Sequence, residues 1–335
     1  MKIIAPSVEL MRSGLETEHI IPEHFIEKVG RTCYKSEDKI IRHEDHPAND
    51  SAFKFVAGLV KRGHEAMIEH WNLIFQTDAG WYEEVKDDWD MLLHNGNIPV
   101  KDRLRPYLRF TDKYDDVTGE MRCIISGNMR AWRDYTKACL EGFGFIPGYL
   151  YGMIKNHPTF FPEFQNWVPV NINNTILHPI SANELIDDFE RGIHQDITMK
   201  FICDRGVSHE IVRHRVASFA QESTRYCNYG LDKFGNEITV VRPSWCVEGD
   251  ALYDIWKGGC KENEETYFAM LDEGATPQHA RSVLPNSLKT EIIVTMNLNG
   301  WNHFFELRCA PDAHPDIREV AGMAQFLINR EVDRG

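Results

Sequence analysis

The spacing of apolar residues predicts several helices. Between residues 52 and 60 apolar side chains recur at three- and four-residue steps, and Gly63 follows as a stop signal, which is typical of an amphipathic helix. The chain end has the same pattern, with Ile317, Val320 and Phe326 among the residues expected to face a core. Helices are therefore predicted over 22–31 with Pro22 in the first turn, over 52–60, over 249–273, from Pro277 through Arg281, and over 313–330.

Short apolar runs bounded by turn residues predict strands. The run over 197–203 is interpreted as a buried strand, and Gly206 and Ser208 after it are expected to begin a short helix that delivers Arg213. Strands are predicted near 2–5 and over 71–76, 197–203 and 289–298.

The middle of the chain, residues 78–195, differs from both flanks because it is rich in aromatic residues, proline and asparagine. We interpret it as a mostly helical insertion packed on a core formed by 1–77 and 196–335, because its aromatic residues would promote aggregation if they were exposed together. Helical patches are expected near 82–93, 117–141 and 182–192, the second with an apolar stripe of Met129, Trp132, Tyr135 and Cys139. The predicted fold class is α+β, a mixed or antiparallel sheet flanked by helices.

Composition indicates a cytoplasmic enzyme. The chain has 335 residues, 42% of them hydrophobic, and a net charge of −14. It has no apolar run near the ~20 residues of a membrane span and no signal-peptide pattern at its beginning. The acidic balance argues against nucleic-acid or membrane-surface partners, and it makes any local cluster of positive charge more informative.

Several common catalytic motifs are missing from the sequence. No phosphate-binding glycine loop is present, and none of the eight cysteines forms a C-x-x-C pair, so we expect reduced, packed thiols and no metal. The spacing of His64, Glu65 and His70 does not fit a zinc protease helix. Residues 43–46 (His-Glu-Asp-His) contain metal-ligand types, but four adjacent polar residues are more typical of an exposed loop.

A cationic cluster lies between residues 213 and 225. It contains Arg213, Arg215 and Arg225 against one acid, in a chain with 51 acids and 37 bases. Arginine binds phosphate through two parallel hydrogen bonds, so the cluster predicts a site for phosphorylated ligands. The neighbouring Val216, Ala217 and Phe219 are expected to be buried, which argues against a simple solvated face.

The same segment resembles a known family. Arg213-His-Arg215, seven residues, and then Ser223 is similar to the signature of the flavin-dependent thymidylate synthases. Gly63-His-Glu65 with Glu69-His70 lies upstream in the family's order, and Arg281-Ser-Val-Leu-Pro285, Asn297 and Leu307-Arg308 follow downstream. The resemblance covers about 30–76 and 196–330 and leaves out the middle.

The resemblance implies reductive methylation of dUMP to dTMP, with FAD as cofactor and with NADPH and methylenetetrahydrofolate as co-substrates. It further implies a homotetramer whose active sites are shared between subunits. Arg308 is implied as the catalytic residue that stabilises charge on the uracil. The implied dUMP-binding residues are Glu210, Arg213, Gln221, Ser223, Thr224, Arg225, Arg281 and Arg308. The implied FAD-binding residues are Cys33, His64, Ala66, Arg213, His214, Arg215, Asn297, Asn299 and His303.

The sequence departs from the family at some of these positions. Glu210 stands where the family has a glutamine that contacts dUMP, and Gln221 stands where it has an acid. Ser223 is an alternative nucleophile, but a serine needs an adjacent base and the nearest, His214, is implied to bind flavin. Two other functions stay open: a non-catalytic nucleotide- or flavin-binding homologue, and a flavin enzyme that places another one-carbon group on a pyrimidine nucleotide.

Overall fold

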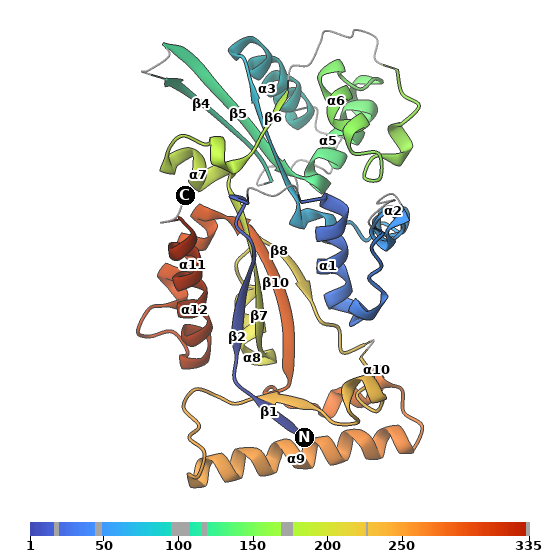
Figure 1. Ribbon diagram of the computed structural model, residues 1–335, viewed down its shortest axis with the longest axis vertical. Coiled ribbons are helices and arrows are strands. Elements are labelled where there is room, and N and C mark those ends of the chain that lie inside the picture. The colour runs from blue at the N-terminus through green and yellow to red at the C-terminus, as the bar shows by residue number, and fades with distance from the viewer. Residues whose placement is uncertain are drawn as a thin grey trace.

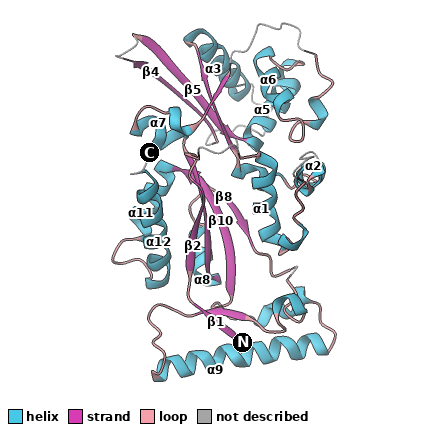
Figure 2. Cartoon of the chain, viewed as in Figure 1, coloured by secondary structure: helices cyan, strands magenta, loops and turns pink. Residues whose placement is uncertain are grey.

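The computed structural model describes residues 1–16, 20–43, 49–94, 107–115, 119–168, 177–225 and 227–332. These residues form two four-stranded antiparallel sheets and one parallel pair of strands, with helices packed around them (Figures 1 and 2). The α+β class predicted from the sequence is therefore confirmed. No helix among the described residues is both long and apolar enough to span a bilayer.

The elements follow the predicted order, with additions. The helices are α1 (Pro22–Tyr34), α2 (Ser51–Lys61), α3 (Ala79–His94), α5 (Met129–Phe143), α6 (Tyr151–Asn156), α7 (Asp188–His194), α8 (Arg205–Ile211), α9 (Ala251–Asp272), α10 (Pro277–Ala280), α11 (Leu298–Arg308) and α12 (Pro315–Val332). The strands are β1 (Lys2–Ile4), β2 (Ser7–Arg12), β3 (Asn72–Thr77), β4 (Leu108–Asp115), β5 (Glu120–Asn128), β6 (His178–Ile180), β7 (Asp196–Asp204), β8 (Ser218–Gln221), β9 (Thr239–Val241) and β10 (Lys289–Asn297).

The central sheet has the strand order β2-β7-β10-β8 and carries the segments that matter for function. One face packs against α8, α11 and α12, with Phe201 of β7 stacked on Trp301 of α11. The other face packs against α1, through Ala220 of β8 and Ile293 of β10. Covering on both faces explains why β7 and β10 are buried along almost their whole length rather than at alternate residues.

A second sheet has the order β4-β5-β3-β6; β4, β5 and β6 come from the predicted insertion 78–195, whereas β3 lies before it, so the sheet is not confined to the insertion. The expectation of a helix over 117–141 is wrong for its first part, because 120–128 form β5, and the helix starts only at Met129, where the Asn128 side chain caps it. A short apolar run suits either a buried strand or a buried helix, so periodicity alone could not separate them. The predicted stripe is confirmed: Met129, Trp132, Tyr135 and Cys139 are all buried in one cluster with α1 and α2.

Polar contacts join this second sheet to the central one. His194 ends α7, directly before β7 of the central sheet, and its buried imidazole makes hydrogen bonds of 2.8 Å to Thr111 Oγ1 of β4 and 2.7 Å to Ser126 Oγ of β5. Arg109 of β4 donates to both carboxylate oxygens of Asp196, which begins β7, at 2.6 and 3.1 Å. Arg109 therefore links residues 78–195 to the central sheet.

Some smaller expectations also need correction. Phe326 is 65% exposed and Val216 is 54% exposed, so neither faces a core in this chain. Helix α8 starts at Arg205, because the Asp204 side chain accepts the Val207 N–H at 2.6 Å, rather than at Gly206 or Ser208. Among the described residues no group of metal ligands gathers. Glu44, Asp45 and His46 lie outside the described residues.

Candidate active site

Arg308 lies in the last turn of α11, where the helix dipole favours a positive charge. The helix is held by buried Trp301 and Phe304, so the arginine projects from a fixed support. Its guanidinium donates to the Glu210 carboxylate through Nη1 at 2.8 Å, to the Glu210 backbone oxygen through Nη2 at 3.1 Å, and to His214 Nε2 at 3.0 Å. We call Arg308, Glu210, His214 and the neighbouring His303 the Arg308 cluster.

The chemistry of His214 follows from these contacts. Its Nε2 accepts a hydrogen bond from Arg308, which requires a neutral ring with the proton on Nδ1. Burial, followed by the positive charge of Arg308, lowers the pKa of His214 to about 4. The ring lies edge-on to Phe304 at 4.8 Å and faces His303 at 6.2 Å between centroids. His214 is thus an oriented, uncharged group beside a charged one.

Two further arginines flank His214 and face solvent. Arg213 and Arg215 are exposed and make no ion pair or hydrogen bond through their side chains with the described residues. Val212 and Val216 beside them are exposed apolar side chains. Unpaired guanidinium groups next to apolar surface suit a ligand that has both a diphosphate and a planar ring, so these residues fit a flavin nucleotide.

A second positively charged feature is an open cavity of about 500 Å³ near the turn after α10. We call it the cationic cavity. It is lined by Arg205, His209, Thr224, Gln278, Arg281, Ser282, Leu284, Pro285, Asn286 and Leu288. This lining includes Arg205, Arg281 and a histidine and has no acidic residue, in a chain with a net charge of −14. The cavity is therefore suited to an anion such as a phosphate group.

The residues after β8 connect this cavity to α1. The Ser223 N–H donates to the backbone oxygen of Cys33 at 3.1 Å, and the Ser223 hydroxyl accepts from the Arg225 N–H at 3.4 Å. Arg225 Nε donates to Gln278, a residue of the cavity wall, at 3.3 Å. In the Arg308 cluster, Nε2 of His214 is already hydrogen-bonded to Arg308. The described contacts therefore give Ser223 no activating base.

Gln221 and Glu222 have structural partners. Gln221 Nε2 donates to Ser208 Oγ at 2.8 Å, which ties β8 to α8. Glu222 is buried, and Lys289 pairs with its carboxylate at 2.9 Å. Glu222 therefore forms a buried ion pair and does not take the place of the acid that the family has at position 221.

The residues expected on the flavin ring side lie around the ends of α1 and α2. His64 is exposed, and its Nδ1 lies 3.1 Å from the Tyr34 hydroxyl. Ala66 is exposed beside it, whereas Cys33 is buried against Met67. A cavity of about 360 Å³ opens next to Tyr34, with Arg31, Lys35 and Arg62 in its wall.

Three other expected flavin contacts lie on α11. Asn297 is the N-cap of this helix: its Oδ1 accepts the Gly300 N–H at 2.9 Å, and its Nδ2 donates to the Ile193 oxygen at 3.1 Å. Asn299 is exposed and lies so close to Gly192 that a Cβ there would come within 2.5 Å of its Oδ1. His303 is exposed one turn before Arg308.

None of the cysteines has the character of a nucleophile. Burial raises the pKa of Cys227 and of Cys33 to about 12, and it raises the pKa of every other cysteine as well. Cys227 also faces the Glu222 carboxylate at 3.7 Å, which opposes thiolate formation. The geometry therefore favours a chemistry that forms no covalent bond to a cysteine.

Comparison with known proteins places the C-terminal part of the chain. Residues 192–332 match the family described as thymidylate synthase complementing protein. Flavin-dependent thymidylate synthases are similar to it: that of Pyrococcus furiosus is 42% identical over 119 residues, 36% of this chain and 48% of the relative. That of Geobacter sulfurreducens is 37% identical over 117 residues, 35% of this chain and 49% of the relative. The C-terminal part of the chain is therefore similar to this family.

The likeness has limits. The chain spans about half the length of the curated relatives that it matches. Among solved structures, the UMP/dUMP methylase PolB from Streptomyces cacaoi bound with 5-Br dUMP is 24% identical, covers 42% of this chain and 69% of that one, and has a TM-score of 0.35. With so low a TM-score, this likeness supports no statement about the fold as a whole.

Within residues 192–332, which match the family model, the structure divides the expected dUMP residues into two groups. Glu210 and Arg308 meet in the Arg308 cluster, whereas Thr224 and Arg281 line the cationic cavity. Helix α8 serves both, because His209 lines the cavity and the next residue, Glu210, holds Arg308. Sequence reasoning missed Arg205 and His209; their four-residue spacing directly after a buried strand was the available signal.

Proposed function

We propose that this protein is a flavin-dependent thymidylate synthase that converts dUMP to dTMP in the cytoplasm. FAD would be its cofactor, with NADPH as reductant and methylenetetrahydrofolate as carbon donor. The observation that carries the proposal is the Arg308 cluster, because it sets an oriented arginine beside two solvent-facing arginines in the segment that matches the family. The lack of an activated cysteine supports a flavin route rather than attack by a thiolate.

Each residue group has a role in this proposal. Arg213 and Arg215 would hold the phosphates of FAD, and His214 and His303 would border its ring system. When bound and reduced, the flavin supplies the hydride. Arg308 would lie against the uracil carbonyl side and stabilise negative charge as it develops on the ring. Thr224, Arg225 and Arg281, joined by Arg205 and His209, would bind the dUMP phosphate in the cationic cavity.

The two groups also support shared active sites. Successive residues of a helix point about 100° apart, so His209 and Glu210 present the cationic cavity and the Arg308 cluster on different sides of α8. A nucleotide that needs both a phosphate site and Arg308 could then take one from each of two subunits of a homotetramer. Mixing the separately inactive Arg281→Ala and Arg308→Ala variants would restore about a quarter of the wild-type activity if subunits combine at random. Full absence of restored activity in proven mixed oligomers would place both arginines in one subunit.

The decisive experiment is release of tritium from dUMP labelled at C5, in the presence of methylenetetrahydrofolate, NADPH and FAD. We expect release that depends on all three, a flavin spectrum in the purified protein, and unchanged release by Cys227→Ser. A protein that binds flavin and dUMP without releasing tritium would be a non-catalytic homologue. Release with a product other than dTMP in mass spectrometry would identify a different one-carbon transfer.

A further inference from the structure

A further cavity is lined by none of the residues proposed above to bind FAD or dUMP. It measures about 650 Å³, within the roughly 300–1,000 Å³ typical of small-molecule sites. It shares no lining residue with the cationic cavity. We call it the insertion-side cavity, because the end of α6 (156–159) and the segment around β6 (179–182) form one of its walls. The start of α1 and residues 71–74 also line it.

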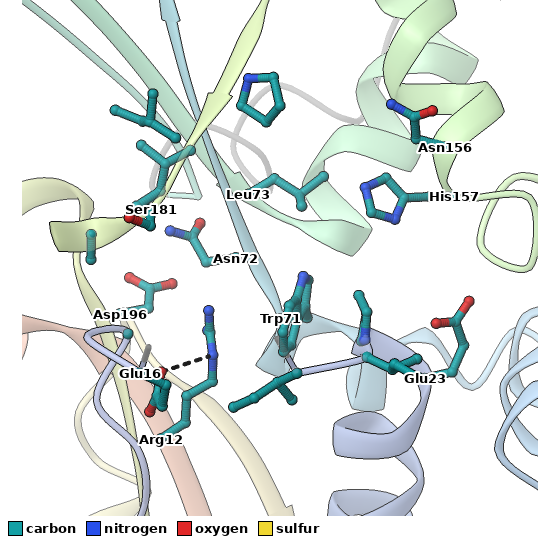
Figure 3. A pocket seen from close by; sticks show the side chains of 18 of the residues that line it. Arg12, Glu16, Glu23, Trp71, Asn72, Leu73, Asn156, His157, Ser181 and Asp196 are labelled. Atoms are coloured by element: carbon teal, nitrogen blue, oxygen red, sulfur yellow. Dashed lines mark ion pairs between the residues drawn. The ribbon is translucent and has the colours of Figure 1, made fainter. Parts of the chain in front are cut away.

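The cavity has an apolar body. Ile21, Phe53, Leu73 and Ile180 line it together with several prolines, and the indole of Trp71 lies in its middle (Figure 3). The Arg12 guanidinium carbon lies 4.1 Å from the centroid of the Trp71 ring and covers one of its faces. An apolar body with a few polar groups is the usual composition of a site for a flat organic ligand.

Polar groups in the wall lack partners inside the protein. Trp71 is 8% exposed, and its Nε1 has no hydrogen-bond acceptor among the described residues. Arg12 Nε likewise makes no hydrogen bond among the described residues, although it is ion-paired with Glu16 at 4.0 Å. Glu23 is 6% exposed and has no ion pair or hydrogen bond with the described residues. Leaving a buried donor or carboxylate without a partner costs about 1–3 kcal/mol or more, so these groups point to a ligand that satisfies them.

The other charged residues in the wall indicate which charge the ligand should carry. Asp196 is already matched by Arg109, and Glu16 accepts the Ser13 N–H at 2.5 Å and faces Arg12. The Glu23 carboxylate is therefore the charge left over. His157 lies on the same side of the cavity as Glu23 (Figure 3), and burial lowers its pKa to about 4, so its imidazole is neutral at pH 7. A phosphate in this cavity would meet an unpaired acid and a single partly matched arginine.

We propose that the insertion-side cavity is a second ligand site, for an unphosphorylated, neutral or cationic bicyclic nitrogen heterocycle that donates N–H groups to Glu23 and accepts from Trp71 Nε1. A carboxylate pairs well with adjacent ring N–H and amino groups, which guanine and pterin rings share. The proposal gives the insertion a role that does not depend on the thymidylate synthase reaction. Eight of its 21 lining residues come from 78–195, which lies outside the family match except for 192–195.

Calorimetric titration of the full chain, without FAD or dUMP, tests this site. The probes are guanosine, 6-hydroxymethylpterin and, as the anionic control, GMP. We expect guanosine or the pterin to bind, and GMP to bind at least about tenfold more weakly than guanosine because of the unpaired acid. If only one of these two neutral ligands binds, the result identifies whether the site takes a guanine or a pterin ring. No heat from either neutral ring at millimolar concentration, or GMP binding as tightly as guanosine, overturns the proposal.

Two variants locate the binding. Glu23→Gln keeps the shape and removes the charge, and Trp71→Phe keeps a ring and removes the donor; each should weaken binding about tenfold, the effect of losing one charge-assisted or buried hydrogen bond. Glu83→Gln, an exposed position on α3, is the matched control and should bind like the wild type. If Trp71→Phe does not fold, Glu23→Gln alone decides: unchanged affinity in that variant places the ligand elsewhere and refutes the site.

Discussion

Arg308 and Glu210 form a two-point contact, in which Nη1 lies 2.8 Å from the carboxylate and Nη2 lies 3.1 Å from the backbone oxygen of the same residue. With His214 as the third acceptor, each nitrogen of the guanidinium is engaged. Glu210 stands where the family resemblance implies a glutamine that contacts dUMP. The Glu210 carboxylate is thus bonded to the arginine that the proposed reaction needs. Bound dUMP must share this contact with Glu210 or replace it.

Glu210→Gln should therefore bind dUMP more tightly than the wild type. The amide still fills the space and can accept from Arg308, but it no longer opposes a nucleotide that carries negative charge. Removing a partly exposed charge of this kind changes affinity by about 0.2–1 kcal/mol, or up to roughly fivefold. Calorimetric titration with dUMP measures it, with the exposed Glu262→Gln on α9 as the control. Weaker binding by Glu210→Gln would mean that the carboxylate assists the nucleotide.

Arg308→Ala should abolish most of the methylation without unfolding the chain. The side chain is partly exposed and its contacts with Glu210 and His214 are polar, so the main loss is a donor aimed at developing charge. Loss of one such donor typically lowers the rate about 10²–10³-fold. Tritium release gives the rate and circular dichroism checks the fold, with the exposed Arg318→Ala on α12 as the matched control. Turnover near the wild-type rate would remove Arg308 from the chemistry.

Arg281→Ala should weaken dUMP binding and leave the flavin content unchanged. The arginine lines the cationic cavity and is exposed, so its contribution is electrostatic and should diminish as salt is added. A charge-assisted hydrogen bond contributes about 1.5–3 kcal/mol, or a factor of roughly 10 to 150 in Kd. Titration at low and high salt measures this, and Arg330→Ala at the end of α12 controls for overall charge. An equal loss of flavin would show that the cavity binds the cofactor instead.

The sequence predicted the chemistry of Arg308 but none of its contacts. Glu210 and His214 reach it across more than ninety residues, and only the packing of α8 against α11 brings them together. Asn297 shows the opposite case. The resemblance implied a flavin contact, yet its amide caps α11, a helix that was not among those predicted.

The insertion was predicted to be docked, and its stripe from Met129 to Cys139 was placed correctly, because helical spacing is a local signal. The strand at 120–128 was missed since part of its burial arises from pairing with β3, which is distant in sequence. The insertion-side cavity could not be predicted either. Its walls come from segments more than a hundred residues apart, and Glu23 and Trp71 have no motif around them.

His194 makes the free energy of unfolding depend on pH. Burial, followed by the charge of Arg109, lowers the pKa of His194 to about 3, below the ordinary histidine value near 6.5. The unfolded chain therefore takes up the proton first, so this contribution is complete above about pH 6.5 and is lost as the pH falls toward 3. Burial also lowers the pKa of His70, His157 and His214, and all three act in the same direction.

Urea unfolding between pH 7 and pH 4 should show a steep fall in the free energy of unfolding. His194→Asn should reduce that slope by about one proton, or ~1.4 kcal/mol per pH unit, because asparagine does not titrate. The exposed His178→Asn on β6 is the control and should leave the slope unchanged. An unaltered slope in His194→Asn would show that this histidine is already protonated in the folded chain.

Arg109 and Asp196 should prove the strongest polar link between the insertion and the core. Both are largely buried, and Arg109 Nη2 also donates to Asn72 at 2.8 Å. Arg109→Met keeps the aliphatic packing but leaves Asp196 as a buried, unpaired carboxylate, which typically costs about 3–5 kcal/mol. Adding Asp196→Asn should recover much of that loss, since an amide needs no counter-charge. Urea unfolding measures the free energies, and limited proteolysis reports whether the insertion separates first. If the double variant is no more stable than Arg109→Met, the loss comes from packing and the ion pair does not hold the insertion in place.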